Sequence, residues 1–191
     1  MIPQPSISEI VPGLFIGNLW TTYSVNFLEQ HHIKSILSVN DESHALWGVE
    51  NFTALIPAAR HRRIFCLDNH TQDLLLHMRE ACDFIEESLP HGNVLVHCVH
   101  GRSRSATFVI AYLMRQRRRS LSEILAEVQQ KRSRVKPSEN FLAQLEVWGQ
   151  VEYEIWEDEN KKMPKEPYAM LLKEKGLTGE LPKKPANLED W

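Results

Sequence analysis

The chain has 191 residues, of which 42% are hydrophobic, and its formal net charge at pH 7 is −3. This length is enough for one domain with a sizeable core and an appendage, and the small net charge excludes the strongly basic surface of a typical nucleic-acid-binding domain. No apolar run approaches the roughly 18 residues of a membrane span, and no apolar signal segment follows Met1. We expect a monomeric protein of the cytoplasm, with the nucleus as a further location.

Short apolar runs alternate with helical patterns along the chain. The strand-like runs lie at 13–17, 33–39, 64–67 and 93–97, and the helical patterns lie near 21–31, 72–88, 104–117, 121–132 and 138–157. Such alternation predicts an α/β domain with a mostly parallel central sheet flanked by helices. The pattern over 72–88 repeats apolar residues at three- and four-residue steps and includes Cys82, so packing is the expected role of that cysteine.

From about Val151 the chain becomes acidic and aromatic, and then rich in lysine and proline. We therefore divide it into a domain at 1–150 and a helix extension with a C-terminal tail at 151–191. The tail also carries the larger apolar residues Tyr168, Met170, Leu171, Leu172 and Trp191. These predict partial docking on the domain, and a disordered linker is the alternative.

The sequence HCVHGRSRS, from His97 to Ser105, lies where the strand over 93–97 gives way to the helix over 104–117. Backbone N–H groups of such a turn converge with those of the helix N-terminus, which favours binding of a phosphate. Gly101 permits a tight turn, and Arg104 offers a planar fork for two phosphate oxygens. Helix N-termini and neighbouring cations favour the thiolate form of cysteine. We expect Cys98 to attack phosphorus and form a cysteinyl-phosphate that water hydrolyses.

This stretch resembles the active-site loop of cysteine-dependent protein phosphatases, and its continuation over 103–107 resembles the dual-specificity subfamily. The resemblance extends over about residues 6–150, through the runs 10–18 and 33–40 and the later stretch 137–145. It implies a protein tyrosine phosphatase-like fold and a small catalytic domain that no docking domain precedes. It also implies the phosphate-binding residues Val99, His100, Gly101, Arg102, Ser103 and Arg104.

The resemblance gives each catalytic role a position in this chain. Cys98 corresponds to the nucleophile, Arg104 to the phosphate clamp, and Ser105 to the hydroxyl that eases loss of the thiolate; His97 would support the loop. The family's general acid is an aspartate on a separate upstream loop. Asp68 fits, since it follows the strand-like run 64–67 in a polar stretch. Asp73 is the rival, at the start of the next helix, where capping is its alternative role.

We therefore expect a phosphatase that acts on phosphotyrosine and on phosphoserine or phosphothreonine in proteins, with no metal and no cofactor. His100 and Arg102 stand where the family usually has small residues, and a His-Gly pair here also occurs in related RNA 5′-triphosphatases. Hydrolysis of RNA 5′-phosphates or phosphoinositides is one alternative, and a phosphate-dependent binding module is another. The span 41–63 is expected to form the wall of a shallow substrate pocket.

Other cysteines and basic residues leave further alternatives open. The three cysteines lack the paired spacings of a disulfide scaffold or zinc module, and Cys66 is expected to pack in a strand, with a disulfide to Cys98 as the alternative. The chain also has three basic clusters. Such clusters usually form solvated faces, but if they gathered on one side of the protein they would steer acidic substrates toward it. The clusters are Arg60 with Arg62 and Arg63, Arg115 with 117–119, and Lys131 with Arg132, Arg134 and Lys136.

Overall fold

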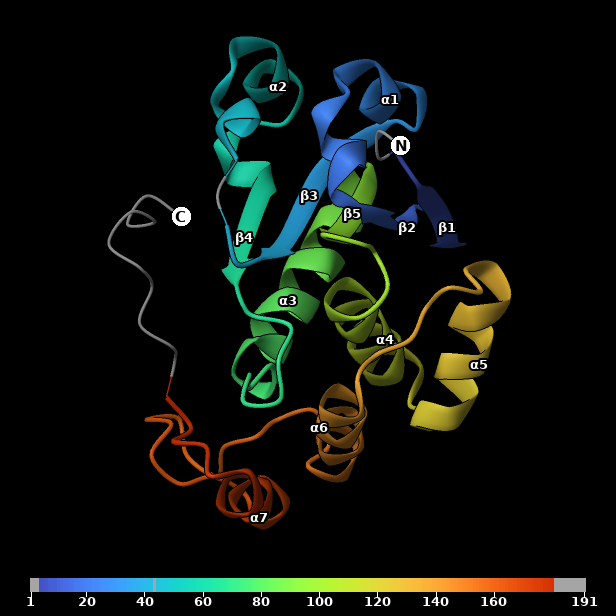
Figure 1. The fold of residues 1–191 in the computed structure, drawn as a ribbon. Helices are drawn as coiled ribbons and strands as arrows, with labels where there is room; N and C mark the ends of the chain where they lie inside the picture. Colours follow the sequence, from blue (N-terminus) through green and yellow to red (C-terminus); the bar gives the residue numbers. More distant parts are fainter. Residues whose placement is uncertain (1–3, 43, 181–191) are drawn as a thin grey trace.

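The computed structural model describes residues 4–42 and 44–180, and its centre is a five-stranded sheet. The strands are β1 (Ile7–Val11), β2 (Leu14–Asn18), β3 (Ile33–Asn40), β4 (His61–Phe65) and β5 (Asn93–Cys98). Their order in the sheet is β1-β2-β5-β3-β4, with β1 antiparallel to β2 and the other neighbours parallel. Figure 1 shows this sheet with helices on either side of it, so the predicted α/β architecture is confirmed.

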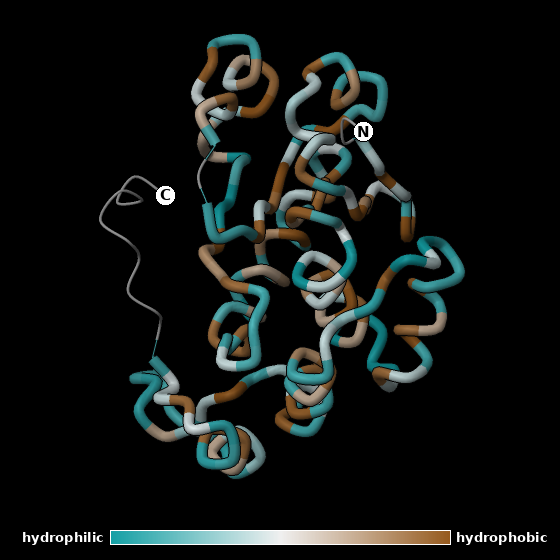
Figure 2. The backbone as a smooth tube through the Cα atoms, in the orientation of Figure 1, coloured by the Kyte–Doolittle hydropathy of each residue, from teal (hydrophilic) through white to brown (hydrophobic). Residues whose placement is uncertain are grey.

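Helices cover both faces of the sheet. The larger layer contains α3 (Leu75–Ser88), α4 (Arg104–Arg117), α5 (Leu121–Lys131) and α6 (Glu139–Gln150), which share one apolar core with the strands. The smaller layer contains α1 (Val25–Gln30) and α2 (Glu50–Leu55), which pack on a second apolar cluster. In Figure 2 apolar and hydrophilic residues alternate around the helices, the outer connections are mostly hydrophilic, and β4 begins with hydrophilic residues.

The central pair of elements is β5 followed by α4. Every residue of β5 after Asn93 is buried, as expected of a parallel strand that is covered on both faces. In α4, all residues from Arg104 to Met114 are buried, because α3, α5 and α6 pack around this helix. The turn between β5 and α4 is therefore anchored at both ends in the core.

Several elements differ from the sequence-based expectations. The pattern over 21–31 divides into the 3-10 helix η1 (Leu19–Tyr23) and α1, because the Ser24 side chain caps α1 by accepting from Phe27 N–H. The helix expected to reach residue 157 ends at Gln150, because Glu152 and Tyr153 adopt positive φ. The strand expected at 64–67 is His61–Phe65, so Cys66 follows the strand. The elements that none of the predicted runs covers are β1, η2 (Ala45–Gly48), α2, η3 (Ala58–Arg60), η4 (Leu89–His91) and α7 (Glu166–Lys175).

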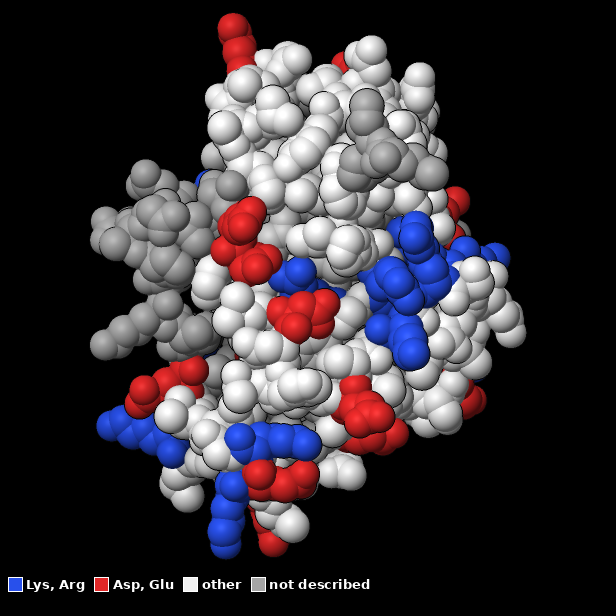
Figure 3. All heavy atoms as spheres, viewed as in Figure 1, with Lys and Arg blue, Asp and Glu red and all other residues white. Residues whose placement is uncertain are grey.

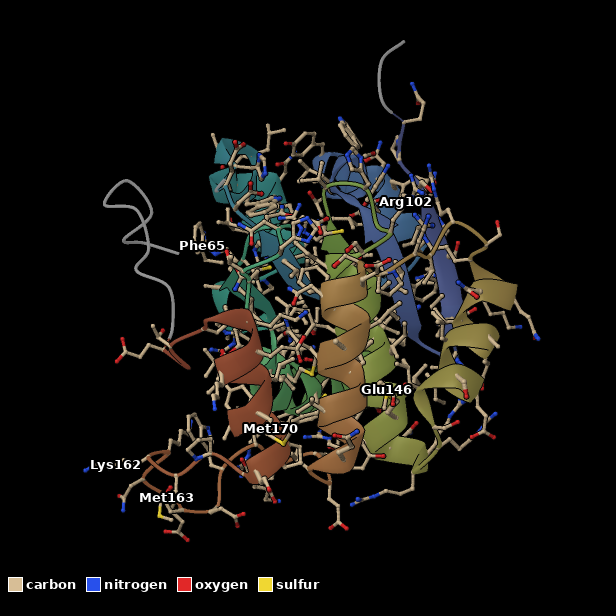
Figure 4. The ribbon with its side chains drawn as sticks, turned by 60° about the horizontal axis from the view of Figure 1, so that its bottom comes forward. Phe65, Arg102, Glu146, Lys162, Met163 and Met170 are labelled. Atoms are coloured by element: carbon tan, nitrogen blue, oxygen red, sulfur yellow. The ribbon has the colours of Figure 1, made fainter. Side chains whose placement is uncertain are left out.

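The C-terminal extension lies against the domain through α7. Figures 1 and 4 show α7 alongside α6, with Met170 on the outer surface. Tyr168 and Leu171 are buried, whereas Met170 is exposed. Trp191, which we also expected to dock, lies outside the described residues. Within 4–42 and 44–180, no helix is both long and apolar enough to cross a membrane.

The burial of α4 predicts a large stability effect for its aromatic core residue. Phe108 is completely buried, whereas Met163 is 61% exposed. Phe108→Ala should lower the free energy of unfolding by about 3–5 kcal/mol through lost burial and a cavity. Met163→Ala is the control and should change it by less than about 0.5 kcal/mol. Urea unfolding followed by tryptophan fluorescence measures both, and equal effects of the two changes would contradict this packing.

Candidate functional site

The loop between β5 and α4 has its shape fixed at Gly101. This residue has a φ of +63°, and a Cβ here would lie 2.4 Å from the carbonyl oxygen of Gly17 in β2. Both conditions exclude a side chain. Arg132 closes the other side of the loop, because its Nε donates to the Gly101 carbonyl at 2.9 Å. The sequence-based expectation of a tight turn at Gly101 is met.

Cys98 lies at the base of this loop and is 2% exposed. The Gly101 N–H and the Ser105 hydroxyl each donate to its Sγ, both at 3.3 Å. Ser105 is itself completely buried in the first turn of α4. Hydrogen bonds that point at sulfur stabilise a thiolate more than a thiol. The geometry therefore suits Cys98 to act as a nucleophile, with Ser105 as its hydrogen-bond donor.

The Arg104 guanidinium is fixed on one side of the same loop. Its Nη1 donates to Asp41 Oδ1 at 3.0 Å and to the Cys66 carbonyl at 2.9 Å. Burial alone would lower the pKa of Arg104, but the neighbouring Cys98, Cys66 and Asp41 raise it above its ordinary value. The sequence analysis placed Asp41 only in a pocket wall. The sequence contained one clue to this role. Asp41 directly follows the strand β3, and this loop directly follows the strand β5.

Asp68 lies in the segment 66–74 between β4 and α3, which we call the acid loop. The Ser103 hydroxyl donates to Asp68 Oδ1 at 3.1 Å, and Asp68 Oδ2 lies 3.7 Å from Arg104 Nε. The Asp68 side chain is 40% exposed. The structure thus brings Asp68 next to the loop over residues 98–104, which we call the phosphate loop after its expected role, and leaves Asp68 partly exposed.

Asp73, the rival acid, is buried near the start of α3. Its Oδ1 accepts from Leu75 N–H at 3.0 Å, and its Oδ2 accepts from the Tyr168 hydroxyl at 2.7 Å. Burial raises the pKa of Asp73, and the hydrogen bonds from Tyr168, Leu75 and Leu76 oppose that increase. The hydrogen-bond partners of this carboxyl are thus the start of α3 and a residue of α7, and none of them belongs to the loop between β5 and α4.

Two polar residues of α6 hold the acid loop by its backbone. The Gln144 side chain accepts from Leu74 N–H at 2.6 Å and donates to the Gln72 carbonyl at 2.8 Å. The Asn140 side chain donates to the Gln72 and Asn69 carbonyls. The sequence analysis identified this helix but assigned no role to its buried amides. Asn140 and Gln144 are polar residues four positions apart on an apolar helix face, and this spacing could have indicated a buried polar contact.

His97 supports the loop from inside the core. Its Nε2 lies 2.6 Å from Ser38 Oγ, which lies 2.8 Å from His61 Nε2. Burial lowers the pKa of His97 to about 3, and burial also lowers that of His61 to about 3. Both rings are therefore neutral at pH 7 and share one serine hydroxyl. Ser38 and His61 were missed, because their place beside His97 depends on the strand order.

The rim of the loop carries aromatic and basic side chains. The exposed His100 ring stacks on Trp20 with centroids 6.3 Å apart. Arg102 is exposed, and its Nε donates to the Arg134 carbonyl at 3.2 Å. Figure 4 labels Arg102 beside the phosphate loop, and Figure 3 shows basic side chains gathered over the connection from α5 to α6. Arg132, for which the sequence left a solvated face and a substrate-steering cluster as alternatives, is instead buried and binds the Gly101 carbonyl.

The other two cysteines are completely buried and free. Burial raises the pKa of the Cys66 thiol well above its ordinary range, and burial raises that of Cys82 to about 12. Both are therefore neutral thiols at pH 7. Cys82 lies in the apolar core against α4, as its helical position predicts.

Comparisons of the sequence match the residues that form this site. The family model described as "Dual specificity phosphatase, catalytic domain" matches residues 14–151. Human dual specificity protein phosphatase 5 is 35% identical over 138 residues, which are 72% of this chain and 34% of that protein. Rat protein phosphatase Slingshot homolog 3 is 32% identical over 176 residues, which are 88% of this chain and 26% of that protein. The chain thus spans about a quarter to a third of these relatives.

Solved structures match the fold over a similar extent. The human tyrosine phosphatase-like serine/threonine/tyrosine-interacting protein has a TM-score of 0.68 and 31% identity, covering 76% of this chain and 96% of its own. The Yvh1 phosphatase domain from Chaetomium thermophilum has a TM-score of 0.68 and 29% identity, with the same coverages of 76% and 96%. These matches confirm the expected protein tyrosine phosphatase-like fold.

The neutral histidines predict an acid-sensitive stability. In the unfolded chain His61 takes up a proton near its ordinary pKa of 6.5, but in the folded protein it does so only near 3. Its contribution to stability is complete above pH 6.5 and is lost as the pH falls toward 3. Within that window one such histidine lowers the free energy of unfolding by about 1.4 kcal/mol per pH unit of acidification.

Replacing His61 should therefore flatten this dependence. In His61→Gln, the slope of the unfolding free energy against pH between about 5 and 6 should decrease by about 1 kcal/mol per pH unit. His91 is exposed, and His91→Gln should keep the original slope. Urea unfolding at several pH values gives these slopes, and an unchanged slope in His61→Gln would contradict a neutral buried ring.

Proposed function

We propose that this chain, which belongs to the dual-specificity phosphatase family, is a protein phosphatase that hydrolyses phosphotyrosine, phosphoserine and phosphothreonine. One observation carries the proposal. A buried Cys98 Sγ receives hydrogen bonds from Gly101 N–H and Ser105 O–H at the base of a loop between a strand and a helix. Arg104, at the start of α4, and Asp68, from the acid loop, lie beside it. We further propose that the domain at 1–150 catalyses the reaction, as a cytoplasmic or nuclear monomer.

The first step forms the cysteinyl-phosphate. Loop N–H groups and the Arg104 fork bind the phosphate oxygens, so that the Cys98 thiolate faces phosphorus. As the S–P bond forms and the P–O bond to the leaving group breaks, Asp68 donates a proton to the departing oxygen. The products are the free hydroxyl of the substrate and a phosphorylated Cys98. His97, neutral and bonded to Ser38, keeps the loop in place.

The second step regenerates the thiolate. The Asp68 carboxylate accepts a proton from a water molecule whose oxygen attacks phosphorus, and the S–P bond breaks. The departing sulfur carries the electron pair, and the Ser105 hydroxyl donates a hydrogen bond to it. That donor stands 3.3 Å from Sγ. Phosphate leaves, and both residues return to their initial protonation states.

Substrate binding is proposed to use the rim described above. The exposed Arg102 and Arg134 lie on one side of the phosphate loop and favour acidic residues beside the phosphorylated one. His100 and Trp20 add an aromatic surface there. The segment 41–63, which contains η2 and α2, forms the opposite wall. Phosphoproteins with acidic flanks are therefore the proposed substrate class.

Replacing the nucleophile should separate catalysis from binding. Cys98→Ser should reduce phosphate release by roughly 10³-fold or more, because a serine hydroxyl is not ionised at neutral pH. Phosphopeptide binding, measured by calorimetry, should persist. Arg104→Lys should weaken both, because a point charge cannot replace the planar fork. Turnover by Cys98→Ser at the rate of the unmodified protein would disprove the mechanism, and binding without turnover in the unmodified protein would indicate a binding module.

Replacing the proposed acid should affect substrates according to their leaving groups. Asp68→Asn should slow hydrolysis of a phosphoserine peptide by about 10²–10⁴-fold, because an alkoxide needs a proton to depart. p-Nitrophenyl phosphate should be affected much less, since its phenolate leaves readily. Glu87 is an exposed carboxyl on α3, and Glu87→Gln is the control, which should leave both rates unchanged. If Asp68→Asn leaves the phosphopeptide rate unchanged, or if RNA 5′-phosphates or phosphoinositides are the better substrates, the proposed function is wrong.

A further inference from the structure

The C-terminal extension reaches the acid loop through one buried hydrogen bond. The family match ends at residue 151, and Tyr168 of α7 lies beyond it. Tyr168 is completely buried, and its hydroxyl donates to Asp73 Oδ2 at 2.7 Å. Asp73 is itself only 6% exposed. A residue outside the matched domain is thus a direct partner of the loop that carries Asp68.

The extension has an internal structure that holds Tyr168 at this place. The chain reverses after α6 at Glu152 and Tyr153, which have positive φ. Lys165 N–H then donates to the Ile155 carbonyl at 2.9 Å and brings the chain back to start α7. The Trp156 ring packs edge-on against the Tyr168 ring, with centroids 5.7 Å apart. Contacts within the extension therefore hold the Tyr168 ring in place.

A short series of contacts connects Asp73 to Asp68. Gln72 Nε2 donates to the Asp73 carbonyl at 3.2 Å, and Gln72 Oε1 accepts from Leu67 N–H at 2.8 Å. Leu67 directly precedes Asp68. Residues 72–74 are buried, whereas 67–71 are exposed. The exposed half of the loop thus takes its position from the buried half, and Tyr168 contacts that buried half.

Residues 177–180, which follow α7, also border the acid loop. A pocket of about 200 Å³ lies between them, lined by Leu67, Asn69, Gln72 and Asp73 on one side and by residues 177–180 on the other. Gly179 lies close to Tyr168, since a Cβ at this glycine would be 3.7 Å from the Tyr168 hydroxyl. The extension therefore flanks the loop at two places.

We propose that the C-terminal extension acts as a clamp that positions the acid loop, with Tyr168 as the positioning residue that acts on Asp68 through Asp73 and Gln72. The inference rests on the proposed function, in which Asp68 is the general acid. Tyr168 touches no atom of the phosphate loop in any of its hydrogen bonds or ring contacts among the described residues. Its effect must therefore be on proton transfer rather than on phosphate binding.

Removal of one hydroxyl tests the clamp. Tyr168→Phe keeps the buried ring but leaves Asp73 without that donor. The kcat for a phosphoserine peptide should fall about tenfold, because a misplaced acid protonates the alkoxide poorly. The kcat for p-nitrophenyl phosphate should change less than about twofold, and KM should change little for either substrate. An equal loss on both substrates would indicate general destabilisation and would overturn the proposal.

The same segment supplies a matched control. Tyr153 also lies in the extension, where its ring contacts Trp148 and Arg118 and its hydroxyl has no hydrogen-bond partner among the described residues. Tyr153→Phe should therefore leave both rates unchanged. In an Asp68→Asn background, Tyr168→Phe should cause no further loss on the phosphoserine peptide, since the positioned group is already absent. A further tenfold loss in that background would also overturn the proposal.

Amide hydrogen exchange separates the clamp from the identity of the acid. In Tyr168→Phe, the amides of Leu67 and Leu74 should exchange faster, while those in the middle of α4 keep their protection. This measurement does not depend on catalysis. If Asp68→Asn is fully active but exchange at Leu67 increases in Tyr168→Phe, the acid assignment fails and the clamp stands. If exchange there is unchanged, the clamp is disproved, whatever the acid.

Discussion

The backbone at Gly101 is the constraint on which the site depends. Its positive φ and its close approach to the Gly17 carbonyl leave no room for a side chain, and Arg132 binds its carbonyl from the other side. Because these contacts fix the peptide, the Gly101 N–H points at Cys98 Sγ. The environment of the thiol is therefore set by β2 and by Arg132 as well as by the loop sequence. The shape of this loop therefore depends on the neighbouring strand β2 and on Arg132, and not on the sequence of the loop alone.

Arg104 shows how the site is organised before a substrate binds. Its Nη1 is occupied by Asp41 and by the Cys66 carbonyl, while its buried Nε has no hydrogen-bond partner among the described residues. The bonds of Nη1 thus fix the plane of the guanidinium, and Nε remains available to donate to an anion. A side chain fixed in this way loses little conformational entropy when it binds a phosphate. Under the proposed mechanism, Asp41 therefore assists phosphate binding although it is itself an anion, because it fixes the guanidinium.

The sequence predicted those features that depend on local pattern. The run from His97 to Ser105 lies between one buried strand and one buried helix, so its shape follows from residues close in sequence. Ser38 and Asp41 could not be assigned, because they come beside the loop only where β3 pairs with β5. The short α2 buries only Phe52, which leaves no periodic signal. Tyr168 was identified as a docking residue, but its partner Asp73 lies 95 positions away in sequence.

Ion pairing distinguishes basic clusters that look alike in the sequence. Arg115, Arg117 and Arg119 each pair with a carboxylate from α3 or α5. Arg102, Arg134 and Lys136 are exposed beside the phosphate loop, and none has a carboxylate within salt-bridge distance in the described part of the chain. Since charges separated by more than about 10 Å are largely screened in physiological salt, this unpaired cluster adds positive potential at the loop, whereas the paired arginines of the other cluster add little there. Under the proposed function, these three unpaired cations would attract an anionic substrate to the loop although the net charge of the chain is −3.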